Sequence, residues 1–354
     1  MRLVAALTAA TLLATAGVAS AAPARQGAVQ EIIDQLTTSG GALGIQARIN
    51  GRDTVRSGVA ELGSRKPVPH NGTFRVGSVT KPFVSTVVLQ LAGEGKLELD
   101  APVSHHLPGL VDDRITVRQL LQHTSGLYNY TDALPLDPAG FPSIRFKTWT
   151  PQELLAVSTS KPLDFEPGTR WNYSNTNYVV AGLLVEKITG RPFQQAVEQR
   201  ILKPLRLTDT VLPRNSVEVP GPHAHGYYPD ASGKPVDVTR LSPSWGWAAG
   251  EMISTTRDLD TFLTALLAGK LLKPVQQKEL TKTSAVSPDY GLGLAVASLP
   301  CGTTVYGHDG QIHGYGTMMV GTPNGKRLEL SLTEAADGAS PGDGYSRLLN
   351  HVFC

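Results

Sequence analysis

The period of the hydrophobic positions changes twice along the chain, and these changes predict where strands and helices lie. Residues 42–50 and 52–62 favour two strands joined by Asn50-Gly51, a dipeptide typical of two-residue hairpin turns. From Ser78 to Ala92 the apolar residues recur on one helical face. The same criteria predict further helices and strands, the helices at 28–36, from 150 onward, 178–189, 256–267 and 345–352, and the strands at 291–298, 303–307, 314–321 and 327–333.

Strands therefore occur near both ends of the sequence, and helices fill the middle. This order predicts an α+β fold, with one antiparallel sheet flanked by the N- and C-terminal helices and an inserted, mostly helical lobe. We expect residues 22–95 and 280–354 to form the lobe that contains the sheet, and residues 96–279 to form the helical lobe. A cleft between two such lobes is a usual place for a functional site.

The first residues have the pattern of a secretory signal peptide. Met1-Arg2 supplies a positive charge, residues 3–18 are apolar, and Ala19-Ser20-Ala21 matches a signal peptidase site. We expect a signal peptide at 1–21 and a secreted, extracellular protein without a membrane anchor after cleavage. The alternative is an N-terminal membrane anchor, for which the apolar run is short.

The composition excludes some classes of binding partner. The 354 residues include 32 Lys and Arg against 30 Asp and Glu, a net charge of +2. Nucleic-acid binding and polybasic membrane binding both need a clear cationic excess, so we expect neither. The two cysteines, Cys301 and Cys354, favour a disulfide in an exported protein, and two free thiols are the alternative.

Ser78-Val79-Thr80-Lys81 is the first candidate for chemistry. Positions i and i+3 share a helical face, so Lys81 can reach the Ser78 hydroxyl and activate it as a nucleophile. Pro82 belongs in a first helical turn, which places Ser78 at a helix N-terminus where backbone N–H groups favour an oxyanion. Ser158 and Lys161 have the same spacing, but Pro162 follows them at a helix end, and we treat this second match as a chance occurrence.

Two other short motifs carry groups suited to proton transfer and substrate binding. Tyr173-Ser174-Asn175 offers a phenol and an amide, and His308-Asp309-Gly310 places an imidazole on a strand. Each motif alone is more easily explained by structure than by catalysis. The histidines show no metal-ligand spacing, and we expect neither a metal nor a cofactor.

In combination the three motifs resemble the conserved boxes of the penicillin-recognising serine hydrolases, which include class C β-lactamases, penicillin-binding proteins and related esterases. Further segments are similar to the exported D-alanyl-D-alanine carboxypeptidases of actinomycetes, namely 74–77, 123–127, 173–182, 250–262 and the Cys301–Cys354 pair. The resemblance covers nearly all of the chain that follows the signal peptide.

The resemblance implies four catalytic roles. Ser78 is the nucleophile that becomes acylated, and Lys81 assists its deprotonation. Tyr173 relays the proton to the leaving group, although either Lys81 or Tyr173 could be the acylation base. His308 stands where many relatives carry Lys, and it either keeps the local field positive or hydrogen-bonds the relay.

It also implies a set of substrate contacts. Asn175 holds the acyl amide of the substrate, and Trp245 lines the pocket. The backbone N–H groups of Ser78 and Gln311 form the oxyanion hole, and Gly310 lets the substrate approach the strand closely.

The implied function is a penicillin-sensitive D-alanyl-D-alanine carboxypeptidase that acts on peptidoglycan stem peptides, with β-lactams as covalent inhibitors. Asp309, Gln311 and Ala295 depart from that pattern, in which relatives carry hydroxyl residues in the third box and an arginine on the adjoining strand, and no Lys or Arg occurs from Thr283 to Gly325. Arg240, Arg327 or a protonated His313 could supply the cation from elsewhere. An esterase, a D-aminopeptidase or a β-lactamase on the same scaffold is therefore the main alternative. A non-catalytic binder of peptidoglycan or β-lactam is a third.

Overall fold

The computed structural model describes residues 21–38, 41–334 and 343–354. Apart from Ala21, the expected signal peptide lies outside these residues. Helix α1 (Ala21–Thr38) begins at that residue, earlier than the helix predicted at 28–36. Within the described ranges, no helix has the length and apolar character needed to cross a bilayer.

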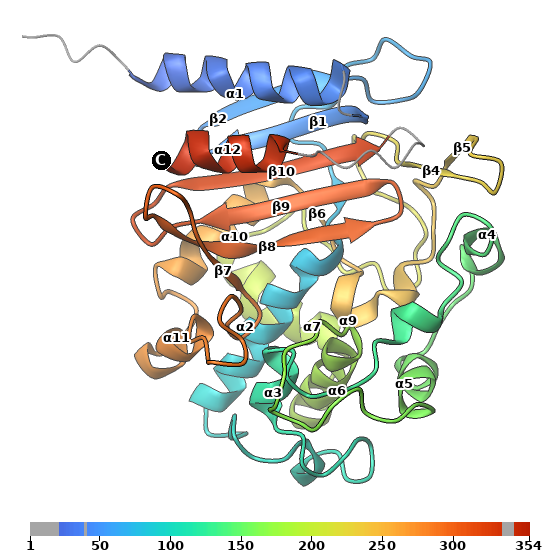
Figure 1. The fold of residues 1–354 in the computed structure, drawn as a ribbon, viewed down its shortest axis with the longest axis vertical. Helices are drawn as coiled ribbons and strands as arrows, with labels where there is room; N and C mark the ends of the chain where they lie inside the picture. Colours follow the sequence, from blue (N-terminus) through green and yellow to red (C-terminus); the bar gives the residue numbers. More distant parts are fainter. Residues whose placement is uncertain (1–20, 39–40, 335–342) are drawn as a thin grey trace, which may run out of the picture.

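A six-stranded sheet forms the upper part of the molecule in Figure 1, and every neighbouring pair of its strands is antiparallel. Its spatial order is β2-β1-β10-β9-β8-β7, so β1 and β10 join the two ends of the chain. This confirms the predicted sheet. The strand bounds are β1 Ala42–Ile49, β2 Asp53–Gly58, β7 Ala295–Ser298, β8 Thr304–Ile312, β9 Tyr315–Gly321 and β10 Arg327–Glu334.

Three strands differ in length from the sequence prediction. Strand β2 ends at Gly58, whose φ of +72° turns the chain out of the sheet. The strand expected from residue 291 begins only at 295, because Gly293 has a φ of +91°. Strand β8 runs on to Ile312, which pairs with Tyr315 of β9. The extension places His308 inside a continuous strand.

The terminal helices α1 and α12 (Gly344–Phe353) pack together over one face of the sheet, as predicted. Ile33, Leu332 and Leu348 are among the apolar side chains buried between them and the strands. The Cys301–Cys354 disulfide ties the end of α12 to the loop between β7 and β8, so the cysteines are not free thiols. Helix α10 (Thr256–Leu267) also packs on β1, β9 and β10.

Helix α2 (Thr80–Gly93) descends from the sheet into the helical part of the molecule (Figure 1), where it contacts α6, α7, α9 and α11. The sequence predicted one buried face, yet nearly all of its residues are buried because other helices surround it. The helices of this part are α3 Val117–Leu121, α4 Phe141–Ile144, α5 Pro151–Thr159, α6 Thr176–Thr189, α7 Phe193–Val197, α8 Lys203–Leu205, α9 Trp247–Gly250 and α11 Pro274–Leu280. The lobe boundaries near residues 95 and 280 stay predictions.

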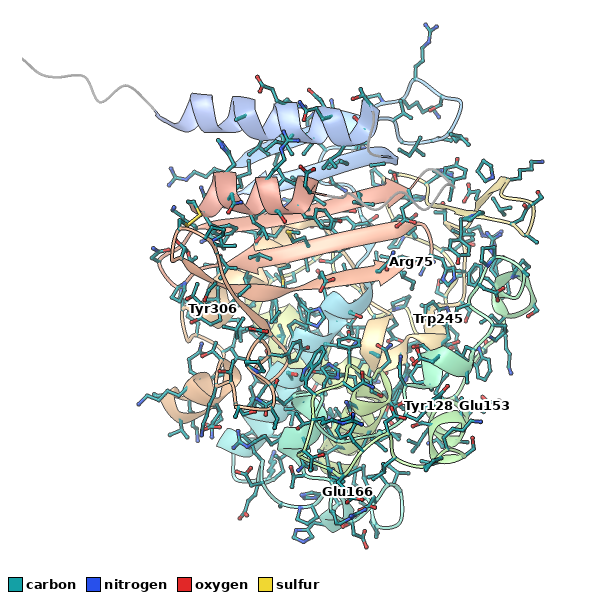
Figure 2. All side chains as sticks on the ribbon, in the orientation of Figure 1. Arg75, Tyr128, Glu153, Glu166, Trp245 and Tyr306 are labelled. Atoms are coloured by element: carbon teal, nitrogen blue, oxygen red, sulfur yellow. A yellow bond between two sulfur atoms is a disulfide. The ribbon has the colours of Figure 1, made fainter. Side chains whose placement is uncertain are left out.

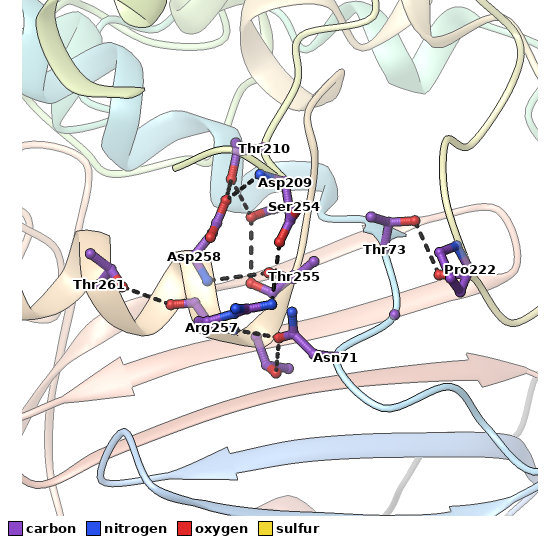
Figure 3. A network of polar contacts seen from close by, with 12 residues as sticks. Asn71, Thr73, Asp209, Thr210, Pro222, Ser254, Thr255, Arg257, Asp258 and Thr261 are labelled. Atoms are coloured by element: carbon purple, nitrogen blue, oxygen red, sulfur yellow. Dashed lines mark hydrogen bonds and ion pairs between the residues drawn. The ribbon is translucent and has the colours of Figure 1, made fainter. Parts of the chain in front are cut away.

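Polar contacts fix the short strand β3 (Phe74–Arg75), which leads directly to Ser78. Arg75, labelled in Figure 2, donates hydrogen bonds to the carbonyls of Val217, Thr239 and Leu241. Strand β3 pairs with β6 (Ile253–Ser254). Figure 3 shows the surrounding network, in which Asp258 accepts a hydrogen bond from Thr210 at 2.8 Å. These contacts hold the segment before the candidate nucleophile.

Candidate active site

The described structure places the Ser78 hydroxyl at the start of α2, as the sequence predicts. The residue lies in a 3₁₀ turn, Gly77–Val79, that continues into the helix. Gly77 has a φ of +52°, which allows the sharp change from β3 to this turn. Lys81 Nζ lies 2.9 Å from Ser78 Oγ.

The surroundings of Lys81 favour its neutral amine. The side chain is fully buried, and this burial lowers its pKa well below the usual value, an effect that Asp309 partly opposes. Besides Ser78, the amine contacts the side-chain oxygen of Asn175 and the carbonyl oxygen of Ala249, each at 2.8 Å. Both of these oxygens only accept, so they use the two hydrogens of a neutral amine. The nitrogen lone pair then faces the Ser78 hydroxyl, which is the geometry of a base.

Tyr173 completes the arrangement from the loop before α6, where its phenol interacts with the Ser78 side chain. Burial raises the pKa of Tyr173 well above its usual value, so the phenol keeps its proton. Lys81 Nζ lies 4.9 Å from the centre of the Tyr173 ring. Among these groups Lys81 is therefore suited to accept a proton from Ser78, and Tyr173 is suited to donate one.

His308 comes to the same site from β8, but it does not supply a positive charge. Its Nδ1 contacts the Asp309 carbonyl oxygen and must carry the hydrogen, while Nε2 lies 2.9 Å from the hydroxyl of Tyr290. Burial is the main cause that lowers the pKa of His308 to about 4. Near neutral pH the ring is uncharged, so a role in keeping the field positive is not favoured.

Strand β8 also brings two backbone groups next to each other. A Cβ at Gly310 would lie 3.1 Å from the nitrogen of Ser78, and one at Gly77 would lie 2.8 Å from the nitrogen of Gln311. The backbone N–H groups of Ser78 and Gln311 are thus close neighbours. This placement is compatible with the expected oxyanion hole.

A cavity of about 460 Å³ adjoins these groups. Its lining combines aromatic side chains with two carboxylates and no Lys or Arg, and consists of Trp171, Tyr173, Ser287, Pro288, Asp289, Tyr290, Ala295, His308 and Asp309. The Asp309 side chain is 85% exposed at this cavity. The lining therefore offers negative charge and apolar surface to a substrate.

Two of the expected substrate contacts have other partners in this structure. The Asn175 amide is occupied, because its oxygen contacts Lys81 and its NH₂ group donates to Asn129 and Thr131. Trp245, labelled in Figure 2, is not part of the cavity lining but packs edge-on against His313. Asn175 thus orients Lys81, and Trp245 supports the interior.

The sequence motifs gave no role to three aromatic residues of the site, His123, Trp171 and Tyr290, although His123 opens the segment 123–127 that resembles the carboxypeptidases. They stand in or beside loops, where no periodic pattern marks them. The available signals were the resemblance of segment 123–127 for His123 and, for Trp171, its proximity to Tyr173 along the chain. The second Ser-x-x-Lys match is structural, since the Ser158 hydroxyl donates to the carbonyl of Tyr128 at 2.6 Å. Within the described ranges, no group of three or more His, Cys, Asp or Glu residues could hold a metal ion.

A buried amine beside a serine, with a phenol and a pair of backbone N–H groups, defines a serine hydrolase site. The beta-lactamase family model matches residues 29–336, and the chain belongs to this family of penicillin-recognising serine hydrolases.

The comparisons with individual proteins agree with this family. A D-stereospecific amidohydrolase from Streptomyces has a similar structure, with a TM-score of 0.84, 42% identity, and coverage of 93% of this chain and 98% of that one. The D-amino acid amidase of Ochrobactrum anthropi SV3 gives a TM-score of 0.81 at 28% identity, with the same two coverages. Penicillin-binding protein 4* of Bacillus subtilis is 28% identical over 84% of this chain and 68% of its own length.

Proposed function

We propose that this protein hydrolyses amides and esters of D-amino acids that carry a free ammonium group, through an acyl-enzyme on Ser78. The preference for the D configuration is supported by similarity to two structural relatives, a D-stereospecific amidohydrolase and a D-amino acid amidase. The preference for a cationic substrate is supported by the two carboxylates in the cavity lining.

The reaction proceeds in two steps, acylation of Ser78 and hydrolysis of the acyl-enzyme. Ser78 Oγ attacks the substrate carbonyl carbon while its proton moves to Lys81 Nζ, and the oxyanion lies at the N–H groups of Ser78 and Gln311. Tyr173 donates its proton to the leaving amine or alcohol, the bond to the carbonyl carbon breaks, and the Lys81 ammonium returns a proton to the phenol. Water then attacks the acyl-enzyme, and Lys81 takes a proton from that water. The Ser78 oxygen leaves with this proton.

One observation carries the proposed substrate class. Asp309 and Asp289 are the charged side chains in the cavity lining, because His308 is neutral and the lining contains no Lys or Arg. A substrate ammonium gains Coulomb energy from these carboxylates, whereas a substrate carboxylate is repelled. A D-amino acid amide or ester with a free amino group fits this charge pattern.

The D-alanyl-D-alanine carboxypeptidase expected from the sequence is the second candidate. Similarity to penicillin-binding protein 4* favours it, and it would use the same Ser78, Lys81 and Tyr173. Its substrate presents a terminal carboxylate next to the scissile bond. The anionic cavity disfavours that group, so we rank this activity, on peptidoglycan stem peptides, below the amidase.

The test compares four substrates: D-phenylalanine amide, its N-acetyl derivative, L-phenylalanine amide, and a diacetylated Lys-D-Ala-D-Ala peptide. We expect the highest kcat/KM for the free D-amide, at least about tenfold above the N-acetyl derivative. The Ser78→Ala variant serves as the control for enzyme-dependent turnover. Faster hydrolysis of the tripeptide than of any amide would reject the proposal in favour of the carboxypeptidase.

We further propose that the protein is exported and that β-lactams acylate Ser78. The apolar N-terminal segment and the Cys301–Cys354 disulfide support export, because disulfides persist in oxidising compartments. Mass spectrometry of the protein purified from culture medium would test both points. We expect a mature N-terminus at Ala22 and a penicillin adduct on Ser78.

A further inference from the structure

His123 is a buried ring directly behind Tyr173. The two ring centres lie 4.2 Å apart and the planes differ by 29°, so the rings are stacked. The His123 ring also lies 5.0 Å from the centre of Tyr290 and 6.3 Å from that of Trp171, both in edge-on contacts. One imidazole thus supports three aromatic residues that line the cavity.

Hydrogen bonds fix the orientation and the tautomer of this ring. Its Nδ1 lies 3.2 Å from the backbone nitrogen of Ser174 and 3.1 Å from the amide nitrogen of Asn177. The backbone N–H of Ser174 can only donate, so Nδ1 must accept, while the Asn177 oxygen accepts from Ser125 Oγ. Nδ1 is therefore an acceptor, and the ring hydrogen is on Nε2.

The fold keeps His123 at this position despite two unfavourable features. Its backbone φ is +60°, in the left-handed region that non-glycine residues seldom adopt. Its Nε2 is buried and has no hydrogen-bond partner within the described residues. Such features persist where the surrounding structure enforces them, and they are most frequent at functional sites. Both are present in the residue that contacts the proton-donating phenol.

We propose that His123 is a positioning residue, whose ring holds Tyr173 in the orientation from which the phenol reaches Ser78 and the leaving group. Its two functions are separable. Nδ1 attaches the ring to Ser174 and Asn177, and this attachment stabilises the loop. The ring face restricts Tyr173, and this restriction serves proton donation. The proposal rests on the serine hydrolase site and not on the substrate class proposed above.

Two substitutions separate the functions. In His123→Asn the side-chain oxygen can replace Nδ1 as the acceptor, and Asn tolerates a left-handed φ, but the stacking ring is lost. In His123→Phe the ring remains, but Ser174 N–H and the Asn177 amide lose their acceptor. We expect the Asn variant to keep its melting temperature within a few degrees, and the Phe variant to melt lower.

The decisive measurement uses substrates whose leaving groups differ in their need for a proton. An amine cannot leave without one, whereas p-nitrophenolate can, so a misplaced Tyr173 slows amides more than p-nitrophenyl esters. For the p-nitroanilide and p-nitrophenyl ester of one D-amino acid, we expect His123→Asn to lower the amide-to-ester ratio of kcat at least about tenfold. His123→Phe should keep that ratio within about threefold of the parent.

Benzylpenicillin provides a second test, because acylation of Ser78 opens the β-lactam amide and does not require the proposed substrate. We expect His123→Asn to slow this acylation by a similar factor. The exposed His105→Asn variant is the matched control and should change neither ratio nor stability. The proposal would be overturned if the amide-to-ester ratio of His123→Asn were unchanged, even with an equal loss for both substrates. It would also be overturned if that variant failed to fold. A fall in the ratio for His123→Phe as large as for Asn would do the same.

Discussion

Gly310 of β8 lies directly against the carbonyl oxygen of Val76, two residues before Ser78. A Cβ at position 310 would come within 2.0 Å of that oxygen, far closer than any real contact. The strand therefore approaches the turn that carries Ser78 only because residue 310 has no side chain.

Replacement of Gly310 by Ala should consequently separate the strand from the catalytic turn. Such a shift moves the N–H of Gln311 away from that of Ser78, and loss of one oxyanion donor costs about 100- to 1,000-fold in kcat. We expect at least this loss in steady-state assays of purified Gly310→Ala. Gly27→Ala is the control, because a Cβ there meets nothing within 4 Å and α-helix α1 favours Ala over Gly. Full activity of Gly310→Ala would refute this account of the oxyanion hole.

The neutral amine of Lys81 predicts a defined pH dependence. Lys81 acts as a base only when unprotonated, so kcat/KM should rise with pH through the pKa of this residue in the free enzyme. Because burial lowers that pKa well below 10.5, the rising limb should lie on the acid side of the usual lysine range. A pH profile of kcat/KM measures it. A limb that rises only near pH 10 would contradict a neutral Lys81.

Substitution of the same residue tests its part in the chemistry. Lys81→Gln keeps a polar group but removes the base, and we expect kcat to fall by about 100- to 10,000-fold. Circular dichroism should show that the variant is folded. Retention of more than a tenth of the parent activity would mean that another group takes the proton from Ser78.

The charge of Asp309 should influence which substrates bind. The carboxylate is mostly exposed and therefore screened, so its attraction for a substrate ammonium is about 1 kcal/mol, or roughly fivefold in KM. Asp309→Asn should raise KM for D-phenylalanine amide by this factor and lower it for a tripeptide with a free carboxylate. The effect on the amide should shrink at high salt. A KM that is insensitive to the substitution would remove the main support for a cationic substrate.

The elements that the sequence predicted best are those whose pattern is local. Ser78 and Lys81 are only three positions apart, so one helical turn brings them together. The strands were likewise recognised from their own residues, and their places at both ends of the chain predicted the antiparallel sheet. Residues such as Tyr290 and His123 could not be found in this way. Each reaches the site from a loop, and its contacts depend on the packing of segments more than 15 residues apart in sequence, as in the Tyr290–His308 hydrogen bond.

Charge states were equally inaccessible to the sequence. The motif alone allowed His308 to be a cation, whereas burial of the ring lowers its pKa to about 4 and favours the neutral form. Likewise, alternation along a strand would place Asp309 and His308 on opposite sides, yet it could not tell which side is exposed. The structure gives 3% exposure for His308 and 85% for Asp309.

Glu251 provides a test of burial that is independent of substrate. The carboxyl follows α9, is 1% exposed, and has one oxygen that accepts from Gln194 at 3.0 Å and another that has no partner within the described residues. Burial raises its pKa from 4.5 to about 8. The folded state thus favours the protonated carboxyl, while the unfolded chain ionises near pH 4.5.

The sign of the resulting pH effect follows from linkage. The contribution of Glu251 is fully present below about pH 4.5 and is lost as the pH rises to about 8, with a total of about 3 to 5 kcal/mol. Glu251→Gln removes the titration and keeps an oxygen for Gln194. We therefore expect the free energy of unfolding, measured with urea, to be larger for the variant than for the parent by a few kcal/mol more at pH 9 than at pH 5. The comparison with the parent cancels the similar effect of the buried Glu329, whose pKa is also raised. An identical difference at the two pH values would mean that Glu251 ionises in the folded protein as readily as in the unfolded chain.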